Sequence, residues 1–203
     1  MRILFTSMVG AALMTAGTAP AQAAGDGAVA IEAAAAALAP GKFVWNDTGT
    51  AEPVTVVVSL PLQRAFVYRG AALVAATAVS TGTDDKPTPT GIYPILQKAV
   101  KHRSNLYDDA PMPYMQRLTW DGIALHAGRN PGFPASHGCI RLPAAIAKRL
   151  FAATDLGTTV VVTDDALVNT TLDPELLRTD TTRANEAQLA SVLASLPPER
   201  AGN

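Results

Sequence analysis

The sequence predicts a mostly β domain with a few helices added, over about residues 42–165, and three observations support this. Short runs of apolar and β-branched residues recur between Val54 and Leu125. Glycine and proline separate these runs, as turns separate strands. A helical pattern begins only after Arg141 and returns after Asp173. The expected architecture is a β-sandwich or meander with one helix after a loop and a helical tail.

The first half of the domain is expected to form a meander. Its three runs are rich in Val, Thr, Phe and Tyr, residues that favour strands. Pro61 and Gly70 lie at the two breaks between these runs. The runs are residues 54–59, 64–69 and 73–80. Three consecutive strands with short breaks indicate an antiparallel arrangement.

The next segments alternate between loops and extended stretches. A loop over residues 87–91 contains two prolines and a glycine. Residues 92–96 then resume an extended pattern in which Pro94 suits an edge strand. A further strand is expected at residues 122–125.

The second half of the domain predicts one helix and one strand. Pro143 precedes an apolar-periodic stretch at residues 144–153, and proline suits the first turn of a helix. The run of residues 158–163 is rich in Val and Thr and is expected to be a buried strand.

The N-terminal residues have the pattern of a signal peptide. An apolar stretch follows Met1-Arg2, and Ala21-Gln22-Ala23 has the small-residue spacing of a cleavage site. We expect residues 1–23 to be removed on export, and the mature protein to act in the periplasm or cell wall without a stable membrane span. The alternative is an uncleaved anchor, which needs about 20 apolar residues, more than this stretch contains.

Two further segments are expected to flank the domain. Residues 24–41 are rich in alanine and glycine and are interpreted as a linker with at most one short helix. Residues 166–203 are interpreted as a C-terminal helical extension that begins near Asp173. Its apolar positions lie on one helix face, at Leu189, Val192, Leu193 and Leu196. Neither segment predicts a function.

The charge of the chain gives no sign of a polyanionic partner. The 203 residues carry a formal net charge of -1, and 16% of them are charged while 48% are hydrophobic. This balance is typical of a folded domain without a basic surface. Nucleic acid is therefore not expected as a partner.

The densest chemical signal surrounds the only cysteine, Cys139. An exported chain with one cysteine cannot form an intramolecular disulfide, so the thiol is either buried and inert or used chemically. Two of the three histidines, His126 and His137, flank it. A neighbouring imidazole can take the thiol proton and later return it to a leaving amine. The pattern therefore favours a cysteine nucleophile with a histidine base.

Other residues nearby suit an acyl-transfer site. Gly138 lets the main chain turn sharply, so that backbone N–H groups can form an oxyanion hole. Arg141 offers a planar guanidinium that suits a substrate carboxylate. Tyr114 and Trp120 are aromatic residues of the kind that line small-molecule sites, although core positions suit them equally. His102 lies in a polar stretch and is expected to be a solvated loop residue.

These residues resemble the signature of the L,D-transpeptidase catalytic domain, also called the YkuD domain. That signature is a histidine, followed downstream by Ser/Thr-His-Gly-Cys and commonly by Arg or Asn two positions later. Here it corresponds to His126, residues 136–139 and Arg141. Weaker similarities run through residues 54–163, including Val79 to Gly82, Thr88 to Ile95, and Met112 to Met115 leading into Trp120.

The resemblance implies an enzyme that acts on the tetrapeptide stems of peptidoglycan. In the family, the cysteine attacks the carbonyl of the third stem residue, releases D-alanine and passes the thioester to an amine acceptor. Carried over, Cys139 is the nucleophile and His126 is the general acid/base. The backbone of His137 and Gly138 belongs to the oxyanion hole. Carbapenem β-lactams are expected covalent inhibitors, and no metal or organic cofactor is implied.

The resemblance also concerns the surroundings of these groups. Ser136 and Arg141 match family positions that shape the substrate site. The short interval between His126 and Ser136 is a departure, and it indicates a trimmed loop over the cleft. Because Ala127 follows the base, a hydrogen bond that orients the imidazole there must come from a backbone carbonyl.

Four alternatives remain open from the sequence. His126, His137 and Cys139 could be three ligands of a zinc ion, or they could form a packed turn without chemistry. The protein could be an L,D-carboxypeptidase that passes the same acyl-enzyme to water. It could also be a non-catalytic module that binds the cell wall, and such a module would not need Cys139.

Overall fold

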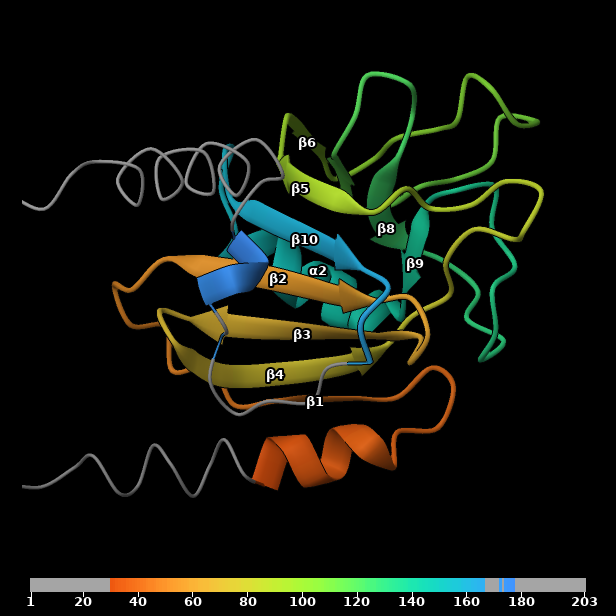
Figure 1. Cartoon of the computed structure of the whole chain (residues 1–203). Coiled ribbons are helices and arrows are strands. Elements are labelled where there is room, and N and C mark those ends of the chain that lie inside the picture. The colour runs from red at the N-terminus through yellow and green to blue at the C-terminus, as the bar shows by residue number, and fades with distance from the viewer. Residues whose placement is uncertain (1–29, 167–171, 173, 178–203) are drawn as a thin grey trace, which may run out of the picture.

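The structure is a computed structural model that describes residues 30–166, 172 and 174–177. Two β-sheets dominate these residues (Figure 1). The six-stranded sheet contains β1 (Phe43–Trp45), β2 (Val54–Ser59), β3 (Arg64–Arg69), β4 (Ala72–Ala78), β5 (Gly91–Pro94) and β10 (Thr159–Thr163). The four-stranded sheet contains β6 (Gln97–Ala99), β7 (Met115–Arg117), β8 (Ala124–Ala127) and β9 (Ile140–Leu142). The mostly β class predicted from the sequence is confirmed.

The meander predicted from the sequence forms the centre of the six-stranded sheet. Its strands β2, β3 and β4 pair antiparallel, and β2 and β3 have the predicted bounds. The order across the sheet is β1-β4-β3-β2-β10-β5, so β10 inserts beside β2 and pairs with it in parallel. Strand β5 lies at the edge, where Pro94 was predicted to be tolerated.

The four-stranded sheet has the order β6-β7-β8-β9. Strands β8 and β9 are parallel, with Leu125 opposite Ile140 and His126 opposite Arg141. The strand that was predicted at residues 122–125 runs instead from Ala124 to Ala127. This shift matters because it places His126 inside the strand, where it pairs with Arg141 of β9.

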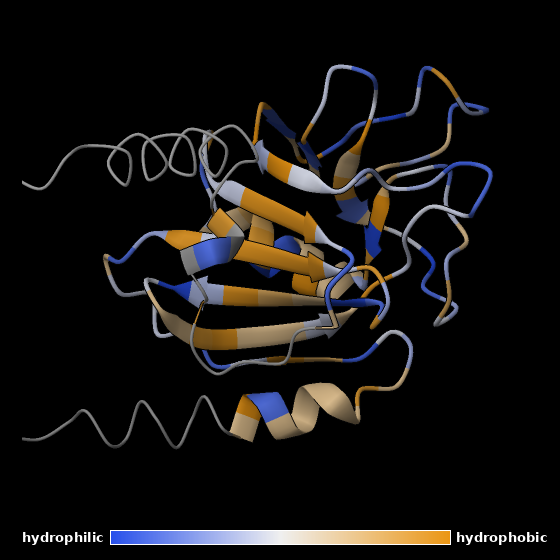
Figure 2. Cartoon of the chain, in the orientation of Figure 1, coloured by the Kyte–Doolittle hydropathy of each residue, from blue (hydrophilic) through white to orange (hydrophobic). Residues whose placement is uncertain are grey.

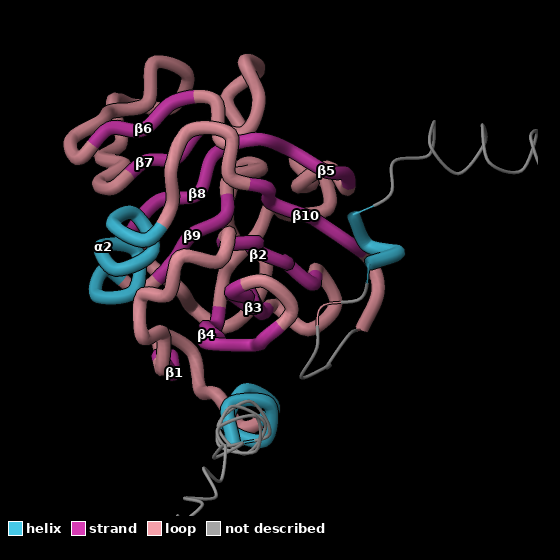
Figure 3. Tube along the Cα trace, turned by 90° about the vertical axis from the view of Figure 1, so that its left-hand side faces the viewer, coloured by secondary structure: helices cyan, strands magenta, loops and turns pink. Residues whose placement is uncertain are grey.

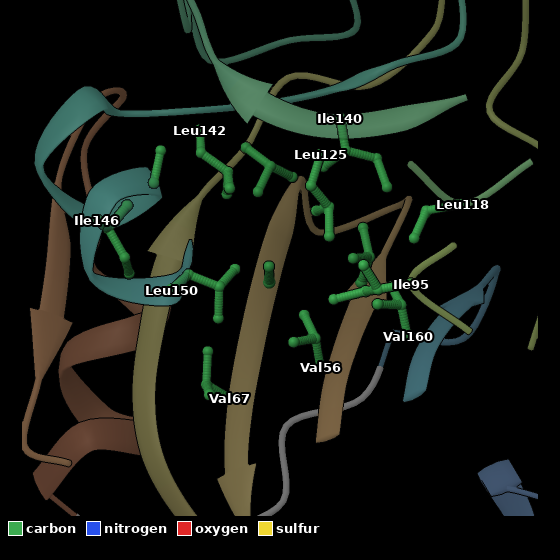
Figure 4. Close-up of a cluster of buried hydrophobic side chains, with 14 of the residues drawn as sticks. Val56, Val67, Ile95, Leu118, Leu125, Ile140, Leu142, Ile146, Leu150 and Val160 are labelled. Carbon is green, nitrogen blue, oxygen red and sulfur yellow. The ribbon is translucent and has the colours of Figure 1, made fainter. Parts of the chain in front are cut away.

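The main core lies between the two sheets and the helix α2 (Ala144–Ala153). Figure 4 shows labelled side chains from all three parts pointing toward one another, among them Val56, Leu125 and Ile146. Each of these three is completely buried, and burial of such a side chain contributes about 1.5–3 kcal/mol. Figure 2 shows the hydrophobic character concentrated on the central strands, most fully on β2 and β10.

The helix α2 packs beside β8, and the turned view in Figure 3 shows it at the same side of the molecule as β9. Its bounds are those predicted, with Pro143 at the N-cap. At the other end, the Lys98 ammonium donates to the carbonyls of Phe151 (2.7 Å) and Thr154. A cation there satisfies carbonyls that have no partner within the helix and complements the helix dipole. These contacts tie α2 to the edge strand β6.

The outer face of the six-stranded sheet is covered by a helix that reaches residue 36 within the described residues. Ile31 and Ala35 of this helix are buried against Phe66 and Tyr68 of β3. The guanidinium of Arg64 donates to the carbonyl of Ala35 (3.2 Å) at the end of the helix. A helix from the alanine-rich segment therefore packs on the sheet. The bounds predicted for the domain, residues 42–165, remain a prediction.

The segments predicted at both ends fall mostly outside the described residues. This holds for the signal peptide at residues 1–23 and for the apolar helix face around Leu189. Within the predicted extension the structure describes a short 3-10 helix, η1 (Pro174–Leu177). No helix among the described residues is both long and apolar enough to cross a membrane.

Candidate active site

Successive side chains in each strand of the four-stranded sheet point to opposite faces, so one face packs in the core and the other carries the candidate site. In β8, Leu125 and Ala127 belong to the core, so Ala124 and His126 face the opposite side. In β9, Arg141 likewise faces away from the core. The parallel register places His126 directly beside Arg141, while Cys139 immediately precedes β9.

A pocket that is partly open to solvent lies on this face of the sheet. Five of the residues predicted for the site line it together: His126, Ser136, His137, Cys139 and Arg141. The structure therefore brings the proposed nucleophile and its proposed base into one cavity. The loop between β6 and β7 supplies part of the opposite wall, including His102 and Tyr107.

The Cys139 thiol is half-buried and donates to the carbonyl oxygen of Gly122 at 3.3 Å. Burial raises the pKa of this thiol above its ordinary value. The Ala124 backbone N–H and the charges of Arg141 and Arg117 lower the same pKa, but burial is the larger effect. A thiol whose pKa is raised needs a base to remove its proton before it can act as a nucleophile.

The His126 imidazole is held by one hydrogen bond, between its Nδ1 and the carbonyl oxygen of Ala127 at 2.9 Å. A carbonyl only accepts, so Nδ1 carries the proton and Nε2 has a free lone pair. The prediction that a backbone carbonyl orients the His126 imidazole is confirmed. Burial lowers the pKa of His126, since a charged imidazolium is poorly solvated there. A neutral imidazole with a free Nε2 is the form that can accept a proton.

The turn at residues 136–139 is fixed by the hydroxyl of Ser136. This oxygen accepts from the Gly138 N–H at 3.1 Å and donates to the Cys139 carbonyl at 2.5 Å. Gly138 has φ +109°, and a Cβ there would lie 2.7 Å from Cδ1 of Ile123. Only glycine fits this turn without strain. Ser136 thus shapes the backbone around the thiol.

Among the pocket residues that the sequence did not assign to the site are His102, Arg117 and Tyr107. His102 was expected to be solvated, but this is wrong: it is half-buried, lines the pocket and has Nε2 3.5 Å from Nη2 of Arg117. Arg117 lines the pocket from β7. Tyr107 stacks on the exposed ring of His137 with centroids 4.4 Å apart. Nothing local in the sequence marks a loop histidine or tyrosine as a pocket wall, since the folding of the loop over the sheet decides it.

Tyr114 and Trp120 do not line the pocket. The Tyr114 ring meets Phe151 edge-on at 5.9 Å and packs against the main core. Trp120 is 73% exposed, with the Arg117 guanidinium 5.9 Å from its ring. Tyr114 is therefore a core residue, one of the two interpretations that the sequence left open.

The residues proposed as alternative zinc ligands do not converge. Within the described part of the chain, no three His, Cys, Asp or Glu side chains are grouped so that they could hold a metal ion. The ring of His137 lies against Tyr107 instead.

Comparisons with known proteins agree on one family. The family model described as "L,D-transpeptidase catalytic domain" (YkuD) matches residues 53–162, which is more than half of the chain. No curated protein matches.

Among solved structures, an L,D-transpeptidase from Stackebrandtia nassauensis is 30% identical, with a TM-score of 0.51 over 56% of this chain and 57% of its own. An L,D-transpeptidase from Mycobacterium smegmatis is 21% identical (TM-score 0.51), over 54% of this chain and 58% of its own. The L,D-transpeptidase LdtMt1 in complex with imipenem is 23% identical (TM-score 0.51), over 55% of this chain and 59% of its own. At their lower identities, the last two show the shared fold alone.

The match therefore spans less than two thirds of each of these solved chains. The match to the family model contains the pocket that holds Cys139 and His126, and all strands of the two sheets except β1 and the last residue of β10. On the strength of the family model, this chain belongs to the L,D-transpeptidase catalytic domain (YkuD) family.

Proposed function

We propose that this protein is an exported L,D-transpeptidase that forms a thioester between Cys139 and the tetrapeptide stem of peptidoglycan. One observation carries the proposal. The only cysteine shares a pocket with a buried imidazole whose Nδ1 is bonded to a backbone carbonyl, so that Nε2 is left as a base. Membership of the family supports this reaction class, and the resemblance described above implies the stem-peptide substrate.

The reaction balances with these groups alone. Sγ of Cys139 forms a bond to the carbonyl carbon of the third stem residue, and its proton passes to Nε2 of His126. The C–N bond to the terminal D-alanine breaks, and the same proton goes to the leaving amine. An acceptor amine then attacks the thioester, gives up a proton to His126 and releases the thiolate, which takes that proton back.

The charge of the pocket supports a carboxylate-bearing donor. Arg117 and Arg141 both line it, and none of the lining residues is acidic. Arg117 donates to the side-chain oxygen of Gln97 (2.8 Å) but has no carboxylate partner among the described residues. Two uncompensated guanidinium groups favour an anionic ligand, because each can form charge-assisted hydrogen bonds to it.

Arg117→Gln and Arg141→Gln are each expected to raise the KM for the tetrapeptide donor by about 10- to 100-fold, the usual effect of losing a hydrogen bond to a charged group. The kcat is expected to change less. Steady-state release of D-alanine measures both constants. Arg129→Gln is the matched control, since Arg129 is exposed and does not line the pocket. An unchanged KM in both pocket variants would contradict the role of the charges.

The pH dependence of acylation follows from the direction of the two pKa shifts. Below its pKa, His126 is an imidazolium and cannot accept the thiol proton, so acylation rises as pH rises through that pKa. Because burial lowers this pKa, the midpoint should lie below the ordinary histidine value of 6.5. Burial raises the pKa of the Cys139 thiol above 9.0, so no thiolate plateau is expected at neutral pH. Single-turnover acylation rates from pH 4 to 10 measure this profile, and a midpoint above 7 would contradict it.

The direct test of the function is product analysis. Purified mature protein is incubated with a disaccharide tetrapeptide and an amine acceptor, and the muropeptides are identified by mass spectrometry. We expect loss of D-alanine and a new cross-link through the third residue. Loss of D-alanine without a cross-link would favour the L,D-carboxypeptidase. Intact tetrapeptide would favour a wall-binding module.

The surrounding segments fit an exported enzyme. We propose residues 1–23 as a signal peptide, 24–41 as the lead into the domain, 42–165 as the catalytic domain and 166–203 as an extension. The periplasm or cell wall would then be the site of action. The complex of LdtMt1 with imipenem makes a carbapenem the natural covalent probe, which we also propose as an inhibitor.

A further inference from the structure

The turn that carries Cys139 contains three backbone N–H groups that could stabilise an oxyanion, those of residues 137, 138 and 139. The Gly138 N–H is already bonded to the Ser136 hydroxyl at 3.1 Å. The N–H groups of His137 and Cys139 donate to no described residue. The donors available to a substrate are therefore those of His137 and Cys139.

The peptide that contains the Cys139 N–H is hydrogen-bonded to Thr88 through its carbonyl. The buried Thr88 hydroxyl accepts from the Gly82 N–H at 2.9 Å, so its single proton is free to donate. It donates to the Gly138 carbonyl at 2.7 Å. The peptide that joins Gly138 to Cys139 is planar and trans, so its carbonyl and its N–H point in opposite directions.

The Gly138 carbonyl is anchored to a residue that is not part of the pocket lining. Thr88 and its neighbours Lys86 and Pro87 are close to Gly138 but do not line the pocket. Holding the Gly138 carbonyl toward Thr88 therefore turns the Cys139 N–H toward the cavity. A hydroxyl that donates to this carbonyl also polarises the peptide, which makes its N–H a stronger donor.

The loop that presents Thr88 is held firmly. At Gly82 a Cβ would lie 2.0 Å from the Lys86 carbonyl oxygen, so only glycine allows the loop to close. The side-chain amide of Gln63 forms two hydrogen bonds with Thr81. Its N–H donates to the Thr81 hydroxyl (2.7 Å), and its oxygen accepts from the Thr81 backbone N–H (3.1 Å). The Thr81 carbonyl in turn accepts from the N–H of Ser136 at 3.0 Å. The loop and the catalytic turn are thus joined at more than one point.

We propose that Thr88 is a positioning residue, whose hydroxyl aims the Cys139 N–H at the oxyanion that forms during acylation. This inference rests on the proposed function. It identifies a group outside the His-Gly-Cys signature that acts through the backbone of the nucleophile. It also predicts that the Gly138 N–H is not a donor to the substrate.

The test compares Thr88→Val, which keeps the shape and removes the hydroxyl, with Thr88→Ser, which keeps the hydroxyl. Two reactions of Cys139 are followed: acylation by imipenem and alkylation by iodoacetamide. Acylation passes through an oxyanion, whereas alkylation displaces iodide at a saturated carbon and does not. We expect Thr88→Val to slow acylation by up to about 10²- to 10³-fold, the effect of losing an oxyanion-hole donor, and to leave alkylation within about twofold. Thr88→Ser should restore acylation.

Other outcomes have distinct meanings. An equal loss of both reactions, or no loss of acylation, would overturn the positioning role. If Thr88→Val does not fold, Thr88→Ala replaces it. The smaller alanine side chain leaves room for water to hydrogen-bond to the Gly82 N–H and the Gly138 carbonyl, which lose their partner. The same selective loss of acylation is expected there. If the unaltered protein reacts with iodoacetamide but with neither imipenem nor the tetrapeptide, the proposed function itself fails and the role of Thr88 with it.

Discussion

Cys139→Ala is expected to abolish turnover of the tetrapeptide while leaving the fold intact. No other thiol exists in the chain, so no other group can form the thioester. The side chain is small and only half-buried beside Met112 and Met115, so its loss should cost at most about 1 kcal/mol. This corresponds to a decrease in Tm of roughly 2–4 °C. Release of D-alanine and thermal unfolding measure the two effects.

Cys139→Ser is the matched control for this variant. Serine keeps nearly the same size, but an alcohol ionises far less readily than a thiol and is not activated to the same extent by His126. Turnover should again fall steeply, with unfolding unchanged. Full activity in either variant would end the interpretation of Cys139 as the nucleophile.

His126→Gln is expected to lower the acylation rate constant by about 10²- to 10⁴-fold, the usual contribution of a general base. Glutamine can replace the hydrogen bond to the Ala127 carbonyl but cannot take up a proton at neutral pH. Because the thiol has a raised pKa, it cannot compensate by ionising on its own. Stopped-flow or quenched single-turnover experiments with imipenem measure the rate constant.

His102→Gln provides the comparison within the same pocket. His102 lies beside Arg117, and its imidazole has no role in the proposed proton transfer. A smaller loss is therefore expected than for His126→Gln. If the two variants lost activity equally, the assignment of His126 as the base would be contradicted.

The parts of the fold that the sequence predicts well are those with their own local pattern. Strands β2 and β3 and the helix α2 have the predicted bounds, because runs of β-branched residues and a proline-led apolar helix are determined locally. The second sheet is different. Strands such as β6 and β7 have three residues each, too few for a period to appear, and they exist because neighbouring strands pair with them. The insertion of β10 beside β2 is likewise a long-range event.

The candidate site likewise contains residues that the sequence predicts and residues that it does not. Cys139 and its flanking histidines are close together in sequence and carry a recognisable pattern. Arg117 and His102 reach the pocket only because β7 and the preceding loop fold over the same face of the sheet. Trp120, an aromatic residue with no local signal of burial, remains on the surface. The spatial neighbours of a site depend on tertiary packing that residue spacing does not encode.

The role of Cys139 as the nucleophile is tested by locating the covalent intermediate. Folded protein is mixed with imipenem, and separately with a tetrapeptide donor, and is then analysed intact and after digestion by mass spectrometry. We expect one adduct per chain on Cys139, with none in Cys139→Ala and far slower formation in His126→Gln. An adduct on any other residue, or no adduct with either probe while iodoacetamide still labels Cys139, would contradict this role.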